Sequence, residues 1–380
     1  MSRIGIAGWN QSSFQERKED VNRNELIFTT VYELLEKTGV DIEDIDSIVS
    51  ASCDTVDGIS ISSAYADDAM GAFMKEESKV EEDGAYALMY AYHRLLMGQW
   101  RNCLIVAHGK SSDAGPAFYA NMMCDPFLLR PLGLETISSA ALQAAAYYHR
   151  YGVSEEDAAR VVVKNRAAGK RNPHTQVRSE VSLEEVLRSP YLASPIKQLE
   201  VPPVSDGAVA VLLATEDYAR QVTDSPVWVD GVGFCQDVYY PGHKELSHSV
   251  SCQKAARDAY RQVGIGDPLK ELDLAEVSEG FSFQELLLYE NLGFCDQGKG
   301  ARLIQDGTTD FEGAFPVNPS GGTLCANATM VAGLARIIEC CRQLTRSAGE
   351  NQVQKDLNRA LAHASSGLFL QSNLVTILSI

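Results

Sequence analysis

Three consecutive carboxylates, Glu81, Glu82 and Asp83, come immediately before an apolar stretch with helical spacing, AYALMYAYHRLLMGQ. The dipole of a helix stabilises carboxylates in its first turn by roughly 0.3–1 kcal/mol each, so a helix start is one explanation of this run. The other explanation is catalytic, because a carboxylate that is buried there would have a raised pKa and could act as a general base. The residue types alone leave both explanations open.

Two later segments also carry side chains that could do chemistry. Ser278 and Glu279 follow an apolar run that predicts a buried strand, and a Ser-Glu pair at a strand end either caps the next helix or lines a pocket. Cys325 could be a nucleophile, although free cysteines are usually buried and inert. No histidine is near Cys325 in the sequence, so folding would have to bring one such as His363 beside it.

The stretch 164–178, KNRAAGKRNPHTQVR, concentrates positive charge in an acidic chain. Arginine and lysine side chains suit phosphate groups, so this stretch could bind the phosphates of a ligand. A solvated run of charges is the alternative. The candidate phosphate contacts are Lys164, Arg166, Lys170, Arg171 and His174.

The elements that must position these residues occur twice along the chain. A strand, a helix, a glycine stop at Gly39, an acidic turn and a second strand follow one another in residues 3–51. The same order returns in residues 226–277, with Gly264 as the stop. A long repeat with this order of elements predicts a duplicated α/β domain. The alternative is that two β-α-β units resemble each other by chance.

A less regular region separates the two similar parts. A long excursion between strands is usually functional when it is ordered. We therefore expect an N-terminal half formed by residues 1–112 and 205–222, a loop domain at 113–204, and a C-terminal half at 223–380.

The composition excludes several classes of protein. The 380 residues include 33 Lys and Arg against 51 Asp and Glu, a formal charge of −18, which argues against a nucleic-acid partner. No apolar run approaches the roughly 20 residues of a membrane span, and the N-terminus does not resemble a signal peptide. The nine cysteines form no CxxC pair, so we expect reduced thiols, no metal site and a cytoplasmic location.

Four segments, taken together, resemble the thiolase superfamily, and most of all its sterol-carrier-protein-type and archaeal thiolases. They are AEVSEGFSFQELLLYENLGFC at 275–295, VNPSGG at 317–322, Asn172-Pro173 followed by SLEEVL at 182–187, and SDGA at 205–208. The resemblance implies a five-layer αβαβα fold of two duplicated halves, with a loop domain over the active site and usually a dimer. It also implies a coenzyme A thioester as substrate or ligand, with no other cofactor.

The departures from the family pattern concern its catalytic residues. The family's nucleophilic Cys-Ala-Ser/Thr-Gly falls on residues 81–84, so Glu81 stands in the place of the nucleophile. The histidine that helps to build an oxyanion hole aligns with Ser278, and the Gly-His-Pro expected after Gly322 is missing. His363 matches a histidine common in this group, although ASSG replaces the glycine-rich turn after it. The resemblance therefore excludes an ordinary Cys-His thiolase mechanism.

The resemblance completes the set of candidate site residues. The catalytic candidates are Glu81, Ser278, Glu279, Cys325 and His363. Ser205, Gly321 and Gly322 join Lys164, Arg166, Lys170 and Arg171 as candidate contacts for coenzyme A, because the glycines allow a tight turn to approach a ligand.

Three functions are compatible with these residues. The first is a catalytically degenerate, acyl-CoA-binding subunit of a hetero-oligomeric thiolase, with a thiolase-like partner or a small OB-fold zinc-ribbon protein. The second is a lyase that cleaves a β-hydroxyacyl-CoA by retro-aldol chemistry, with Glu81 or a pocket tyrosine such as Tyr239 or Tyr240 as the base. The third, an acyltransferase that uses Cys325, is the least supported.

Overall fold

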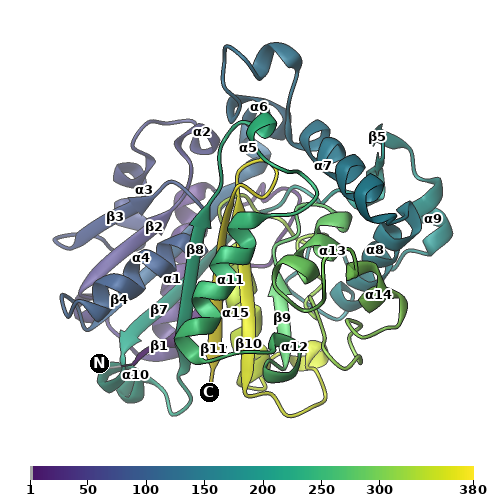
Figure 1. Ribbon diagram of the computed structural model, residues 1–380. Coiled ribbons are helices and arrows are strands. Elements are labelled where there is room, and N and C mark those ends of the chain that lie inside the picture. Colours follow the sequence, from purple (N-terminus) through teal and green to yellow (C-terminus); the bar gives the residue numbers. More distant parts are fainter. Residues whose placement is uncertain (1–2) are drawn as a thin grey trace.

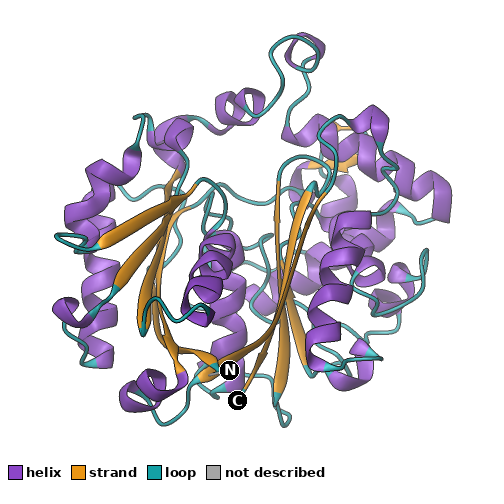
Figure 2. Cartoon of the chain, turned by 60° about the vertical axis from the view of Figure 1, so that its left-hand side comes forward, coloured by secondary structure: helices purple, strands orange, loops and turns teal. Residues whose placement is uncertain are grey.

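The computed structural model describes residues 3–380, and nine of its strands form one sheet that divides into two parts (Figure 1), while β5 and β6 form a separate two-stranded sheet. The two parts meet where β1 pairs with β8 at only two positions, Gly5 with Trp228 and Ile6 with Val227. Figure 2 shows the two sheets diverging from this junction. The N-terminal sheet contains β3 (Glu76–Val80), β2 (Ser47–Ala51), β4 (Asn102–Lys110), β7 (Asp206–Thr215) and β1 (Ile4–Gln11). The C-terminal sheet contains β8 (Val227–Gln236), β11 (Ser372–Ser379), β10 (Arg359–Ser366) and β9 (Leu274–Val277).

Two helices fill the space between the sheets. They are α4 (Gly84–Leu96) and α15 (Ala332–Leu344), which contact each other. The largest apolar cluster joins both helices to buried side chains of both sheets, so this inner layer is the centre of the core. Figure 2 shows helices between the two sheets and on both outer faces.

Helices on the outer faces complete five layers and confirm the predicted αβαβα architecture. On the N-terminal sheet they are α1 (Arg23–Thr38), α3 (Ser62–Met70) and α10 (Glu216–Val222). On the C-terminal sheet they are α11 (Val250–Val263) and α13 (Ser282–Asn291). The short helices α2 (Asp54–Asp57), α12 (Pro268–Glu271) and α14 (Gly300–Gln305) lie in connections.

The repeated order of strand, helix and strand that the sequence shows corresponds to β1–α1–β2 and β8–α11–β9. Helices α1 and α11 end at Gly39 and Gly264, whose φ angles of 66° and 75° are left-handed. Such angles favour glycine because it has no Cβ, which explains why both stops could be predicted.

The excursion at 113–204 is mostly helical. Its elements are α5 (Ser111–Ala114), α6 (Pro116–Met122), α7 (Thr136–Tyr151), α8 (Glu155–Gly169), α9 (Leu183–Arg188), β5 (Tyr191–Ala193) and β6 (Ile196–Lys197). Helices α7 and α8 share an apolar cluster with α13, so this region packs on the C-terminal half. No helix within residues 3–380 is long and apolar enough to cross a membrane.

Candidate active site

The carboxylate of Asp83 joins the N-termini of the two inner helices. Its Oδ1 accepts hydrogen bonds from the backbone N–H groups of Ala85 (2.9 Å) and Leu334 (3.0 Å), and its Oδ2 accepts one from Gly333 (2.8 Å). These amides belong to the first turns of α4 and α15, where a helix dipole favours negative charge. Asp83 thus places a carboxylate at the N-termini of both inner helices.

Glu82 immediately precedes the N-cap of α4, and Tyr86 lies in the first turn of that helix, close enough to interact electrostatically with Glu82. Glu82 is half-buried and has no hydrogen bond or ion pair among the side chains that the structure describes; burial, with a smaller contribution from Asp83, raises its pKa. The hydroxyl of Tyr86 faces Ser372, and burial raises the pKa of Tyr86 well above its usual value. Glu82 is therefore suited to accept a proton, whereas Tyr86 stays protonated and can donate a hydrogen bond.

Ser278 provides an unused hydroxyl at the same edge of the C-terminal sheet. It is 6% exposed, and its Oγ has no partner in the part of the chain that the structure describes. Its backbone is held on both sides, since its N–H donates to His363 O (3.1 Å) and its carbonyl accepts from Ser365 Oγ (3.2 Å). A buried hydroxyl without a partner is costly unless a ligand uses it.

Backbone pairing brings these groups to the same end of the molecule. β9 runs parallel to β10, and Val277 at the end of β9 pairs with His363, so Ser278 lies beside the last residues of β10. Ser366 of β10 pairs with Ser372 of β11. Gly333 packs so closely between Asp83 and Ala364 of β10 that a Cβ there would come within 2.5 Å of both side chains. We call Glu82, Tyr86, Ser278, Ser365 and Ser372 the inter-sheet cluster.

Glu81 does not have the environment that we predicted for it. Its side chain is 52% exposed, forms an ion pair with Lys79 (2.8 Å) and accepts a hydrogen bond from Asp54 N (2.7 Å). The side chain that we proposed as a base is therefore solvated and paired, whereas Glu82 is half-buried and Asp83 is buried.

Glu279 is fully buried and anchors the loop that contains Asn318 and Leu324. It accepts hydrogen bonds from Asn165 Nδ2 (3.0 Å), Asn318 Nδ2 (2.9 Å) and Leu324 N (3.1 Å). Burial, together with the neighbouring Glu285 carboxylate, raises the pKa of Glu279 to about 8. Within residues 3–380 its bonds are all structural, so of the predicted Ser-Glu pair it is Ser278 that has a free functional group.

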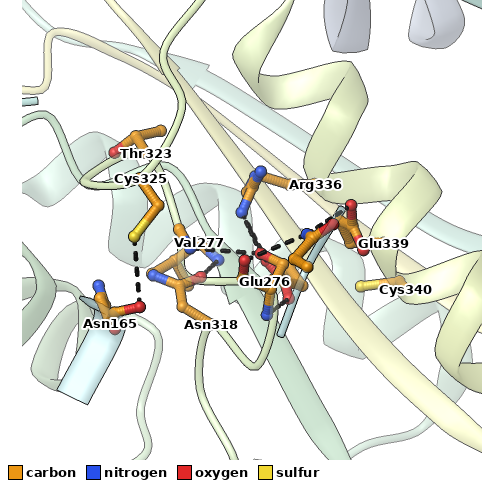
Figure 3. A network of polar contacts seen from close by, with 12 residues as sticks. Asn165, Glu276, Val277, Asn318, Thr323, Cys325, Arg336, Glu339 and Cys340 are labelled. Carbon is orange, nitrogen blue, oxygen red and sulfur yellow. Dashed lines mark hydrogen bonds and ion pairs between the residues drawn. The ribbon is translucent and has the colours of Figure 1, made fainter. Parts of the chain in front are cut away.

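A second group of buried charges supports the same loops. Glu276 pairs with Arg336 (2.8 Å) and accepts from Ser320 Oγ (2.7 Å), and burial raises its pKa to about 7 against the effect of the arginine (Figure 3). Lys164 pairs with Glu285 (2.7 Å) and donates to Val317 O (2.6 Å). Lys164 was predicted to contact the phosphates of coenzyme A. The structure argues against this contact, because the buried ammonium group already has partners inside the protein.

Cys325 and His363 are buried in separate environments. The Cys325 Sγ donates to Asn165 O (3.3 Å), and burial raises the pKa of this thiol to about 12 (Figure 3). His363 Nε2 lies 3.0 Å from Asn373 Oδ1, and burial lowers the pKa of His363 to about 4. The structure does not bring the two side chains together, so Cys325 has no base to form a thiolate.

The other predicted contacts for coenzyme A are spread over several surroundings. The fully buried Ser205 Oγ donates to Gln176 Oε1 (2.6 Å) and accepts from Asn327 N (3.0 Å). Lys170 pairs with Glu180 (3.1 Å) on the surface. The Ser205 hydroxyl is therefore used in bonds within the protein. The ammonium group of Lys170 is exposed to solvent.

Gly321 and Gly322 form the tight turn that the sequence predicts. Their φ angles are 98° and 63°, and a Cβ on Gly322 would meet Glu279 Oε1 at 2.1 Å. Arg166 has a buried Nε without a partner among the described residues, and Arg171 lies 4.3 Å from the centre of the Phe311 ring. No group of three or more His, Cys, Asp or Glu side chains within residues 3–380 is placed to hold a metal ion.

Comparison with known proteins identifies the class. Residues 239–380 match the family described as thiolase C-terminal domain-like. The chain is 30% identical over 367 residues to an acetyl-CoA acetyltransferase of Methanothermobacter thermautotrophicus, covering 93% of this chain and 94% of that one. It is 29% identical to the benzoylsuccinyl-CoA thiolase subunit BbsB of Thauera aromatica over 62% of each chain.

Solved structures agree with the sequence comparison. The Ltp2-ChsH2(DUF35) aldolase superposes with a TM-score of 0.85 at 22% identity, over 99% of this chain and 97% of that chain. A monomeric SCP2-thiolase-like protein of Mycobacterium smegmatis gives a TM-score of 0.76 at 17% identity, over 99% and 77%. The chain belongs to the thiolase superfamily, in its sterol-carrier-protein-2-like branch.

Proposed function

We propose that this chain is a lyase that cleaves the Cα–Cβ bond of a β-hydroxyacyl-CoA without a covalent acyl-enzyme. The observation that carries the proposal is the Asp83 carboxylate, which occupies the amides of both inner helices. Because those amides already bind an anion, they are not available to stabilise a catalytic thiolate. A retro-aldol reaction needs only a base and hydrogen-bond donors for an enolate.

The inter-sheet cluster contains both kinds of group. In the proposed reaction, the Glu82 carboxylate takes the proton of the β-hydroxyl, whose oxygen becomes a carbonyl oxygen. The Cα–Cβ bond breaks, and its electron pair forms the thioester enolate, to which Ser278 Oγ donates a hydrogen bond. Protonated Glu82 then returns the proton to Cα, which gives a shorter acyl-CoA and an aldehyde or ketone. Burial raises the pKa of Glu82, which makes this carboxylate a stronger base than an exposed glutamate.

Substitution of the base tests this proposal. The protein, purified with any chain that co-elutes, is given β-hydroxyacyl-CoA esters, and chromatography measures the shortened acyl-CoA. We expect Glu82→Gln to reduce cleavage by at least about 100-fold, since a general base contributes about that much or more. Glu81→Gln, which changes the neighbouring exposed carboxylate, is the matched control and should retain activity. Full activity of Glu82→Gln would refute the assigned base.

A second candidate is a degenerate, acyl-CoA-binding subunit of a hetero-oligomeric thiolase. It is favoured by Phe73 and Met74, which are 82% and 89% exposed immediately before the edge strand β3. Large exposed apolar side chains beside an open sheet edge are typical of a protein interface. The names of the relatives add support, since BbsB is called a subunit and the Ltp2-ChsH2(DUF35) aldolase names two proteins.

Native purification at low salt, followed by mass spectrometry, separates the two candidates. A stoichiometric thiolase-like chain that retains its own catalytic cysteine and histidine, in a complex whose activity survives Glu82→Gln, would favour the supporting subunit. A small OB-fold zinc-ribbon partner, or a homodimer, together with loss of activity in Glu82→Gln, would favour the lyase.

A further inference from the structure

A cavity of about 360 Å³ lies at the carboxyl end of α15, away from the inter-sheet cluster. Its walls come from the turn after α8, from the last turns of α15 and from the loop after that helix. The lining residues are Arg171, Asn172, Pro173, His174, Arg178, Glu339, Arg342 and residues 347–351. Gly333 and Arg342 are nine positions apart on α15, so this cavity is about 13 Å along the helix from the Asp83 contacts.

Arg342 is the central side chain of this cavity. It is 8% exposed, and both of its hydrogen bonds, to Glu339 Oε1 (2.6 Å) and Gln11 Oε1 (3.1 Å), use Nη1. Nη2 and Nε therefore remain available to a ligand. Glu339 also accepts from Asn172 Nδ2 (3.2 Å), so it is held in place by two donors.

The charge of the lining is positive in a strongly negative chain. Three guanidinium groups, those of Arg171, Arg178 and Arg342, line the cavity together with two carboxylates, Glu339 and Glu350. Arg178 uses only a long hydrogen bond to Lys170 O (3.3 Å) and lies at the exposed rim. The whole protein carries a formal charge of −18, whereas the arginines of this cavity outnumber its carboxylates by one. This local positive charge would attract anions.

We propose that this cavity binds a small dianion with phosphate or carboxylate groups, at a site separate from the inter-sheet cluster. The planar guanidinium of Arg342 offers two parallel N–H groups, which match two oxygens of either anion. Arg178 and Arg171 close over the anion from the rim. The volume suits a small metabolite and excludes a polymer or a lipid bilayer.

Isothermal titration calorimetry on the full chain tests the site, with inorganic phosphate, pyrophosphate and succinate as separate probes. We expect saturable binding of at least one probe, with the phosphate and succinate titrations showing which group is preferred. Arg178→Gln should weaken that binding about tenfold or more, because it removes a charged hydrogen bond. Arg188→Gln, which changes an exposed arginine paired with Glu184 on α9, is the matched control and should leave the affinity unchanged.

Three results would overturn the proposal. They are the absence of saturable binding for all three probes at millimolar concentration, equal weakening by Arg178→Gln and Arg188→Gln, and unchanged binding in Arg178→Gln and Arg171→Gln. Equal weakening in the two variants would mean that the anion binds through general surface charge. Unchanged binding would mean that it binds outside this cavity. Both variants change partly or fully exposed side chains, so we expect them to fold.

Discussion

Asp83 and Gly333 are 250 positions apart in the chain, and the Asp83 carboxylate accepts a 2.8 Å hydrogen bond from the Gly333 backbone. This contact ties the N-terminal end of α15 to that of α4, so one side chain aligns the inner helices of both halves. A carboxylate at two helix ends satisfies amides that otherwise would require a ligand or water. The Asp83 carboxylate therefore organises the end of the inner layer where the two helices begin.

Asp83→Asn is expected to lower the free energy of unfolding by about 2–4 kcal/mol, since an amide side chain can accept with only one of its two groups while three buried donors must be satisfied. Urea denaturation followed by circular dichroism measures this change. Asp224→Asn, at an exposed position, should change stability by less than about 0.5 kcal/mol. Equal stability of the two variants would contradict the bridging role.

Ser278→Ala is expected to reduce β-hydroxyacyl-CoA cleavage by about 100-fold or more, as removal of a single oxyanion donor does in other enzymes. Its thermal unfolding midpoint should stay within a few degrees of the parent protein, because Ser278 Oγ makes no hydrogen bond within residues 3–380. The exposed Ser179→Ala serves as control. An active Ser278→Ala protein would remove this hydroxyl from the mechanism.

Glu279 is expected to make stability depend on pH. Its pKa is about 8 in the folded protein against an ordinary value of 4.5, so between these values the folded state binds more protons than the unfolded state. Stability from this group is therefore fully present below about pH 4.5 and decreases as the pH rises towards 8, by up to about 1.4 kcal/mol per pH unit.

Glu279→Gln removes this titration, so the stability of the parent relative to the variant should fall steadily from pH 5 to pH 8. Urea unfolding across that range of pH measures the difference. Glu43→Gln, at an exposed site, should show no such trend. A constant difference between parent and Glu279→Gln would show that Glu279 keeps an ordinary pKa.

Cys325 is expected to resist alkylation in the native protein, because its thiol is fully buried and its pKa is raised to about 12. Native treatment with iodoacetamide followed by peptide mass spectrometry should modify the partly exposed Cys235 well before Cys325. After unfolding in urea both should react. Rapid native labelling of Cys325, or an acyl adduct on it, would revive the acyltransferase hypothesis.

Local features of the fold could be predicted from the sequence with little error. The helices expected before the stops at Gly39 and Gly264 are Arg23–Thr38 and Val250–Val263 in the structure. Both end at glycines, because a left-handed residue at a helix end is a local steric requirement. The departure of residues 81–84 from the Cys-Ala-Ser/Thr-Gly pattern of the family is likewise visible in residue identity alone.

Which carboxylate is desolvated was decided by tertiary packing. Glu81 and Glu82 are adjacent and chemically almost identical, yet Lys79 and Asp54 hold Glu81 in solvent while Glu82 turns inwards beside Tyr86. The same applies to Lys164, whose partner Glu285 lies on another element. Burial depends on neighbours that are distant in sequence. Residue type alone therefore could not distinguish charged groups that pair inside the protein from charged groups that are free to bind a ligand.

The sequence by itself determined the repeated order of strand, helix, glycine and strand and the helix stops, because each depends on residue type and short-range spacing. Only the tertiary structure decided that Asp83 bridges α4 and α15, that Ser278 keeps a free hydroxyl while Glu279 does not, and that Cys325 and His363 lie apart. The physical reason is that hydrogen bonding and desolvation are set by which side chains meet across the core, which the local chain does not encode.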